Sequence, residues 1–247
     1  MLIRCIISIL LMSAALPVLS QEAPVLKVAT TEYPPFEYVK DGVLQGDDVE
    51  TVRTVLQAMG YEPKFQVLPW ARAEMMVRRG NADLLFSLTS SPERERHYLF
   101  TAPISEARDV LYARKNAGLS WTSYNDLADL SVGVTAGYSY APEFMAWLMQ
   151  GESQVVTMNQ ENPDLAGLRM VAMGRVDVFI CEQTACDYLI ETNKGHYPEL
   201  SRVAALPGVV GDERFFRAAF SRKRPDARAL RNEFNQVLKG LGLAATD

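Results

Sequence analysis

Residues 82–94 read Ala-Asp-Leu-Leu-Phe-Ser-Leu-Thr-Ser-Ser-Pro-Glu-Arg, an apolar run that ends in hydroxyl side chains and an arginine. A nearly continuous apolar run of this length is typical of a strand that is buried on both faces of a parallel sheet. The hydroxyl groups and Arg94 follow this strand directly, at the edge where parallel sheets place their ligands. The stretch therefore predicts an α/β fold with a polar site beyond the end of one strand.

Strands and helices alternate on the amino-terminal side of this run. The pattern predicts strands over residues 25–29 and 64–68 and helices over residues 48–59 and 71–79. Apolar residues recur at helical spacing between residues 48 and 59, and a glycine follows each predicted helix, as is common at helix ends. This alternation is the order expected of an α/β fold with a parallel sheet.

The same alternation starts again after residue 130. It predicts strands over residues 131–135, 154–158 and 176–181 and helices over residues 142–149 and 165–173. A strand-like stretch, 109–114, lies between the two halves, and a strand over 215–220 and a helix over 226–241 close the chain.

The last strand and helix lack a partner unit, which indicates that the chain crosses back to complete the first half. We expect two α/β lobes, joined by two crossings, with a ligand cleft between them. The first lobe would comprise residues 21–114 and 211–247, and the second residues 115–210.

Residues 1–20 have the three-part layout of a secretory signal peptide. Arg4 precedes an apolar run over residues 5–15, and Val18 and Ser20 stand three places and one place before the expected cleavage point. A membrane anchor is the alternative, but the run is short for a span, and no cysteine follows it for lipid attachment. We expect an exported, periplasmic chain.

The composition excludes disorder and disfavours nucleic acid as a partner. Of the 247 residues, 48% are apolar and 22% are charged, close to the average of soluble globular proteins. The formal charge is −5, whereas binding to phosphates requires a basic face.

Cys181 and Cys186 are the cysteines that remain after residue 20. In an oxidising compartment they form a disulfide if the turn between them allows it, and buried thiols are the alternative. His97 and His196 lie far apart in the sequence, and no second cysteine pair is present, so no metal-ligand pattern emerges. We expect no metal and no other cofactor.

Several polar and aromatic residues stand where this architecture places the cleft. Arg94 offers a planar fork for a carboxylate, although Ser91 and Pro92 also fit the start of a helix, and both roles are compatible. Glu182 ends a strand of the second half, where an acid faces a cation across the cleft or lies in an exposed loop. Tyr33 and Trp70 stack on a ligand or pack their turns.

A turn between strand and helix, residues 135–140, offers backbone amides to an anion. It reads Thr-Ala-Gly-Tyr-Ser-Tyr, and it has neither the spacing nor the lysine of a phosphate loop. A nucleotide is therefore not the expected ligand.

The chain resembles the family 3 periplasmic solute-binding proteins, which serve polar amino-acid ABC importers. An ordered set of short motifs over about residues 25–241 carries the resemblance: 33–37 (YPPFE), 46–50 (GDDVE), 80–83 (GNAD), 91–94 (SPER), 100–103 (FTAP), 132–137 (VGVTAG) and 174–178 (GRVDV). Each motif alone is weak, but their order is specific. The resemblance implies the type II periplasmic-binding-protein fold, a cleft that closes on its ligand and a membrane ABC permease as partner. A monomer suits such a hinge-closing receptor.

The resemblance also implies roles for individual residues. Arg94 would bind the α-carboxylate of an amino-acid-like zwitterion, with help from Thr89 and Ser139, and Glu182 would bind its α-ammonium. The other expected ligand-binding residues are Tyr33, Trp70, Ser87, Gly137, Tyr138 and Tyr140. Glu182 is one methylene longer than the usual Asp, and Tyr138 replaces a small hydroxyl residue, so a flat or small ligand, or one other than an amino acid, would also fit.

Two other functions remain open at this stage. Periplasmic cyclohexadienyl dehydratases resemble this family, and Glu182 would serve such an enzyme as a general acid if burial raised its pKa. A ligand-sensing module that acts in trans on a membrane partner is the third interpretation. A binding protein without catalysis is the leading expectation.

Overall fold

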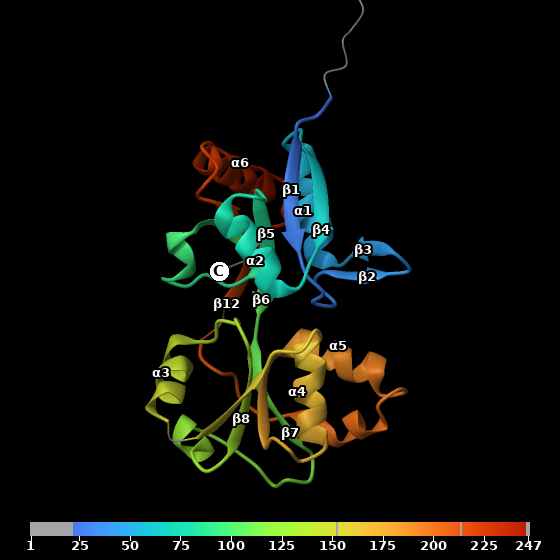
Figure 1. Ribbon diagram of the computed structural model, residues 1–247, viewed down its shortest axis with the longest axis vertical. Helices are drawn as coiled ribbons and strands as arrows, with labels where there is room; N and C mark the ends of the chain where they lie inside the picture. The colour runs from blue at the N-terminus through green and yellow to red at the C-terminus, as the bar shows by residue number, and fades with distance from the viewer. Residues whose placement is uncertain (1–21, 152, 213, 246–247) are drawn as a thin grey trace, which may run out of the picture.

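The computed structural model describes residues 22–151, 153–212 and 214–245, and within them the chain forms two five-stranded sheets and a small two-stranded one. Each large sheet with its helices makes one of two lobes, the first above the second in Figure 1. The expected signal peptide, residues 1–20, lies outside the described residues.

The apolar run at residues 82–88 contains β5, the central strand of the first sheet, whose strand order is β4-β1-β5-β12-β6. The neighbours β1 and β4 run parallel, as do β1 and β5, whereas β12 is antiparallel to both β5 and β6. The strands are β1 (Val25–Thr30), β4 (Glu62–Val67), β5 (Leu84–Leu88), β6 (Tyr98–Ala107) and β12 (Arg214–Ser221). The hairpin β2 (Tyr38–Lys40) and β3 (Val43–Gln45) projects from this lobe.

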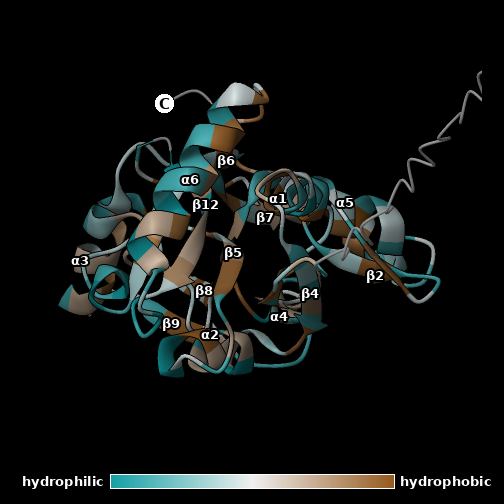
Figure 2. Cartoon of the chain, turned by 90° about the horizontal axis from the view of Figure 1, so that it is seen from above, coloured by the Kyte–Doolittle hydropathy of each residue, from teal (hydrophilic) through white to brown (hydrophobic). Residues whose placement is uncertain are grey.

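Side chains of β5 alternate between two helical layers. Leu84 and Phe86 pack with α1 and α6 on one face, and Leu85 packs with α2 on the other. The helices are α1 (Asp47–Ala58), α2 (Trp70–Arg79) and α6 (Ala227–Gly240). Figure 2 shows the hydrophobic β5 between these amphipathic helices. A strand covered on both faces needs apolar residues at every position, which explains the continuous run.

The second sheet has the order β11-β7-β10-β8-β9. Its strands are β7 (Asp109–Arg114), β8 (Ser131–Thr135), β9 (Gln154–Met158), β10 (Val178–Glu182) and β11 (Val203–Ala205), and its helices are α3 (Pro142–Gln150), α4 (Pro163–Ala172) and α5 (Gln183–Asn193). Short 3₁₀ helices complete the fold at η1 (Arg94–Arg96), η2 (Tyr124–Leu127) and η3 (Pro198–Arg202).

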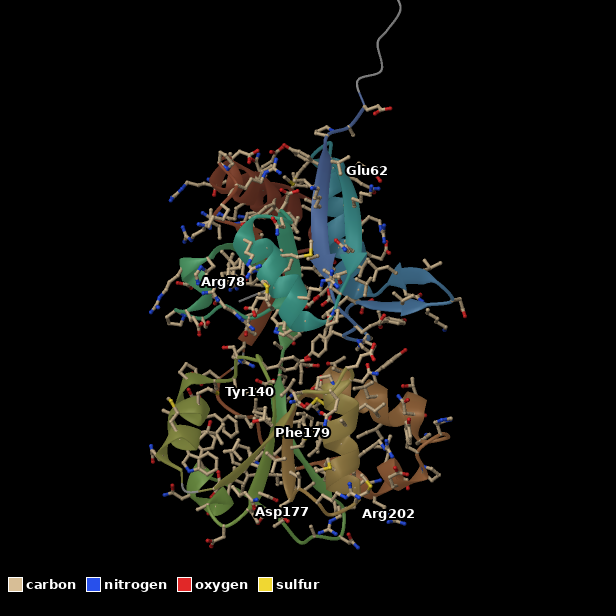
Figure 3. The ribbon with its side chains drawn as sticks, in the orientation of Figure 1. Glu62, Arg78, Tyr140, Asp177, Phe179 and Arg202 are labelled. Carbon is tan, nitrogen blue, oxygen red and sulfur yellow. A yellow bond between two sulfur atoms is a disulfide. The ribbon has the colours of Figure 1, made fainter. Side chains whose placement is uncertain are left out.

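The central strand β10 repeats the arrangement of β5. Val178 and Ile180 pack toward α3, and Phe179 and Cys181 pack toward α4. Figure 3 shows Phe179 inside this lobe.

The two lobes are joined where β6 leads into β7 and where the chain returns into β12. One expected boundary is wrong, because residues 109–114, expected in the first lobe, belong to the second. Strand β7 instead pairs with β10 and β11 in the second sheet, so the first crossing falls between Ala107 and Asp109. A strand that reads Val-Leu-Tyr-Ala is apolar enough for either sheet, and pairing, which the sequence pattern does not reveal, decides between them.

Most expected elements occur within a few residues of their predicted bounds, but β6, α5 and β11 were not predicted. The expected cysteine pair forms a disulfide, with the two Cα atoms 6.2 Å apart. Among the described residues, no helix is both long enough and apolar enough to cross a membrane.

Phe179 provides a test of packing in the second lobe. Its ring lies between two glycines, and a Cβ on Gly167 would stand 2.4 Å from its Cε2 atom, while one on Gly133 would stand 2.9 Å from its Cδ2 atom. Because the ring cannot retreat from α4 without meeting β8, Gly167→Ala overpacks the core. Overpacking costs about 1–3 kcal/mol of stability, and the higher helix propensity of alanine over glycine offsets about 1 kcal/mol of this cost.

We therefore expect Gly167→Ala to lower the free energy of unfolding by up to about 2 kcal/mol in urea titrations, and to be about 1–3 kcal/mol less stable than Gly240→Ala, which gains the helix propensity without the clash. Gly240→Ala is the matched helical control, since nothing lies within 4 Å of its added Cβ. Equal stability of the two variants would contradict the packing described for Phe179.

Candidate functional site

A pocket lies between the two sheets, and segments that follow or begin strands of both lobes line it. The lining residues are Thr31, Tyr33, Glu37, Trp70, Ser87, Leu88, Thr89, Arg94, Asp109, Tyr138, Ser139, Tyr140, Arg214 and Phe216. Residues after β1, β4 and β5 meet residues after β8 here, because the carboxyl ends of parallel strands face a common edge.

Eight of the ten residues expected to bind a ligand line this pocket: Tyr33, Trp70, Ser87, Thr89, Arg94, Tyr138, Ser139 and Tyr140. Figure 3 places Tyr140 in the part of the second lobe that faces the first. Gly137 contacts two of the lining side chains through its carbonyl group. Glu182 does not line the pocket.

Arg94 is the cation at the centre of this arrangement. Its Nη1 donates to the carbonyl oxygen of Thr89 at 3.0 Å, and its Nη2 donates to that of Gly137 at 3.1 Å. Its guanidinium lies over the Trp70 ring, 5.3 Å from the centroid. Glu74 is 3.6 Å from Nε on a partly exposed side. The backbone N–H of Arg94 donates to Ser91 Oγ at 3.3 Å, but the N-cap of the short helix η1 is Glu93, not Ser91 as the sequence had suggested.

Gly137 links the lobes. Its φ of 75° lies in the left-handed region that glycine adopts without strain. In this turn its carbonyl oxygen accepts hydrogen bonds from both Arg94 Nη2 and Trp70 Nε1, the latter at 3.2 Å. Both donors belong to the first lobe, so this carbonyl is a point of contact between the two.

A second arginine in the pocket was not predicted from the sequence. Arg214, the first residue of β12, forms an ion pair with Asp109, the first residue of β7. Its Nη1 also donates to the carbonyl oxygen of Ser139, and its Nε is buried without a hydrogen-bond partner among the described residues. The only signal in the sequence was a charged residue at the start of an apolar strand.

Glu182 does not line the pocket, contrary to the role expected of it. It stands at the N-cap of α5, where its Oε2 accepts from the backbone N–H of Ala185 at 2.7 Å and its Oε1 from that of Arg108 at 3.4 Å. Burial raises the pKa of Glu182 to about 7, and the backbone hydrogen bonds oppose the shift. Its carboxylate thus satisfies backbone donors at a helix start.

Three further buried carboxyl groups lie around the pocket, and none of them was predicted from the sequence as a site residue. Glu37 accepts a hydrogen bond from Thr30 Oγ1 at its Oε2. Asp48 accepts from Ser87 at 2.7 Å and from Ser105 at 3.1 Å, and Asp164 accepts from Thr135 at 2.9 Å and from Tyr138 at 3.2 Å.

Burial raises the pKa of each of these three carboxyl groups. The pKa rises to about 6 for Asp48 and for Asp164, and the pKa of Glu37 rises well above its usual range.

Asp48 positions a side chain of the pocket. Ser87 has a φ of 54°, uncommon for a residue other than glycine, and its hydroxyl is held by the Asp48 carboxylate behind it. Asp48 does not line the pocket, but it supports the site because it fixes the position of the Ser87 hydroxyl.

Aromatic rings form most of the remaining wall. Tyr33 packs edge-to-face on Tyr138 and Phe216, with centroids 6.0 and 5.8 Å apart, and Trp70 packs edge-to-face on Tyr138 at 6.5 Å. Such walls bury flat apolar bodies well. No cluster of three or more potential metal ligands occurs in the described part of the chain.

Comparison with known proteins identifies the family of this chain. The profile of the bacterial extracellular solute-binding proteins, family 3, matches residues 26–243. An arginine-binding extracellular protein, ArtP, of Bacillus subtilis is 28% identical over 109 residues, which are 44% of this chain and 42% of that protein. A probable amino-acid ABC transporter-binding protein of Haemophilus influenzae is 27% identical over 85% of this chain and 76% of its own length.

Among solved structures, a histidine kinase sensor domain with similarity to periplasmic binding proteins superposes with a TM-score of 0.75 at 20% identity. The match covers 90% of this chain and 92% of that one. At this identity the likeness concerns the fold.

The raised pKa of Asp48 predicts a pH dependence of stability. The folded protein binds this proton more tightly than the unfolded chain, so the contribution is present at low pH and is lost as pH rises from 3.8 to about 6. We expect the unfolding free energy of Asp48→Asn relative to the parent to rise by about 2–3 kcal/mol between pH 4 and pH 7, measured by urea titration.

Glu50→Gln is the matched control, because Glu50 lies in the same first turn of α1 and its side chain is exposed. Its relative stability should change by less than about 0.5 kcal/mol over the same range. A flat difference for Asp48→Asn would contradict a buried aspartate that resists ionisation.

Proposed function

The chain belongs to family 3 of the bacterial extracellular solute-binding proteins, and from this we propose that it is a receptor that binds a small carboxylate-bearing solute between its lobes. The observation that carries the proposal is the buried Arg94 guanidinium, which faces the pocket and donates hydrogen bonds to two neutral carbonyl groups. A carboxylate would form stronger, charge-assisted bonds with the same fork.

We propose further that the receptor acts in the periplasm as a monomer and delivers its solute to a membrane ABC permease. The names of the relatives support this role, since one is described as a probable ABC transporter-binding protein and another as arginine-binding. Closure of two lobes around a solute suits such delivery, because the closed form presents a surface that the open form lacks. Amino acids and related carboxylates are therefore the first solutes to test.

We infer that binding occurs without catalysis. The rival function, a dehydratase, needs an acid within reach of the bound solute. Glu182, the acid expected in this role, does not line the pocket, and its oxygens accept from the backbone N–H groups of Ala185 and Arg108. Incubation of the protein with prephenate and with arogenate should leave both unconsumed. Consumption that Glu182→Gln abolishes would overturn this inference.

Arg94→Ala tests the receptor directly. Thermal unfolding is recorded with amino acids, polyamines and small carboxylic acids, since a solute at 100 times its Kd stabilises the folded state by about 2.7 kcal/mol. Loss of a buried charged partner costs about 2–5 kcal/mol of binding energy. Arg94→Ala should therefore weaken the binding of the stabilising solute by about 30-fold or more in calorimetric titrations.

Arg96→Ala is the control for this substitution, because Arg96 lies in the same short helix with its side chain exposed. Its affinity should match that of the parent. A correctly folded Arg94→Ala protein that binds within threefold of the parent would refute the assignment of Arg94.

A further inference from the structure

We propose that Tyr138 sets the length of solute that the receptor accepts, because its ring closes one end of the pocket and separates it from a second cavity. This inference rests on the proposed function and names the class of solute for the same site: short solutes bind, and those whose chains extend past the ring are rejected. Two adjoining cavities, the contacts that hold the ring and the charges behind it support this role.

The second cavity lies beside the pocket, between the two lobes. Its volume is about 180 Å³, whereas that of the pocket is about 50 Å³. Residues 32–34, after β1, line it from the first lobe, and residues 162–165, at the start of α4, line it from the second. Tyr33 and Tyr138 line both cavities, and their rings meet edge-to-face with centroids 6.0 Å apart. These two rings therefore form the wall that the cavities share.

The Tyr138 ring is held in place from its own lobe. Its hydroxyl group donates to Asp164 Oδ2 at 3.2 Å, and Oδ1 of the same carboxylate accepts from Thr135 Oγ1 at 2.9 Å. Asp164 is buried in the first turn of α4, and Thr135 ends β8. Because all three residues belong to the second lobe, the ring moves with that lobe when the cleft opens or closes.

The opposing ring is fixed in the first lobe. Tyr33 packs on Phe36 and Phe216, with centroids 5.5 and 5.8 Å apart, and its backbone N–H donates to the carbonyl oxygen of Glu37. Closure of the lobes therefore brings two fixed rings together. A solute whose chain reaches between the Tyr33 and Tyr138 rings would hold the lobes apart, and such a clash discriminates against long chains.

The charges behind the Tyr138 ring give the second cavity a chemical signature. Its charged lining residues, within the described part of the chain, are two acids, Glu32 and Asp164. Burial raises the pKa of Asp164 to about 6, so this carboxyl group is ionised at pH 8. Its two hydroxyl partners leave lone pairs for a further donor. A long solute with a terminal cation would therefore gain affinity once the ring is removed.

A series of straight-chain solutes tests the length limit by calorimetric titration at pH 8. L-alanine, L-2-aminobutyrate, L-norvaline and L-norleucine share one head group, and each is one methylene longer than the last. A methylene that fits or fails to fit changes binding by about tenfold or more, so the parent should bind L-norleucine at least about tenfold more weakly than the best shorter solute. Tyr138→Ala should bind L-norleucine at least as tightly as the other three.

L-arginine and L-citrulline locate the space that Tyr138→Ala opens, because they have nearly the same size and differ in terminal charge. On this substitution L-arginine should gain about tenfold more affinity than L-citrulline, since its cation meets the buried Asp164 carboxylate. The difference should vanish when Asp164→Asn is added. An equal gain for both solutes, or a difference that survives Asp164→Asn, would overturn the inference.

Asp164→Ala tests the positioning of the ring without removing it. Loss of the hydrogen bond to Tyr138 should improve the affinity for L-norleucine relative to L-alanine by about threefold or more. Asp187→Ala is the matched control, because Asp187 also accepts from a tyrosine hydroxyl of the second lobe, that of Tyr112 at 2.7 Å, and lines neither cavity. An equal shift in both variants would contradict the role of Asp164.

Failure of the inference is distinguishable from failure of the receptor. A parent that binds L-norleucine most tightly, or a Tyr138→Ala protein that keeps the parent's order of affinities, would overturn the inference, and the receptor would stand if Arg94→Ala abolished that binding. If the parent binds none of the four solutes, the inference falls, and the receptor falls with it unless the wider panel yields a solute whose binding depends on Arg94.

Discussion

The buried ion pair between Asp109 and Arg214 is the interaction on which the site depends. Each residue begins a strand immediately after one of the two connections between the lobes, so the pair ties the two crossings together. Burial raises the pKa of Asp109 and the guanidinium of Arg214 opposes the shift. The cost of removing both charges from water offsets much of their attraction, so the main effect of the pair is to fix the geometry. Here it fixes where the lobes meet.

That geometry brings donors of the first lobe onto an acceptor of the second. Arg94 and Trp70 both donate to the carbonyl oxygen of Gly137, and Arg214 donates to that of Ser139. A solute carboxylate would compete with these neutral carbonyl groups for the same donors. It would succeed because a charge-assisted bond is roughly twice as strong as a neutral one. In the proposed receptor, closure and recognition would therefore use the same few N–H groups.

The sequence predicted the lobes and most of the pocket wall because both follow local rules. Alternating strands and helices indicated the sheets, and polar or aromatic residues directly after the strands, such as Arg94 and Tyr138, indicated the edge where they meet. Strand β6 escaped prediction because it lacks a clear period of two and contains Pro103, and its pairing with β12 depends on residues more than a hundred positions away. Asp109 and Arg214 escaped for the same reason, since neither is informative until the crossings bring them together.

Glu182 shows what position alone cannot supply. The resemblance located its backbone at the end of a strand facing the cleft, but the direction of its carboxylate depends on the helix that follows. The disulfide joins Cys181 at the end of β10 to Cys186 in the first turn of α5, on either side of the turn in which Glu182 meets the N–H of Ala185.

The helix dipole and the backbone hydrogen bonds favour the charged form of Glu182, but burial outweighs them and raises its pKa to about 7. The start of α5 therefore sets the direction of the Glu182 carboxylate, and the strand pattern alone does not reveal that direction.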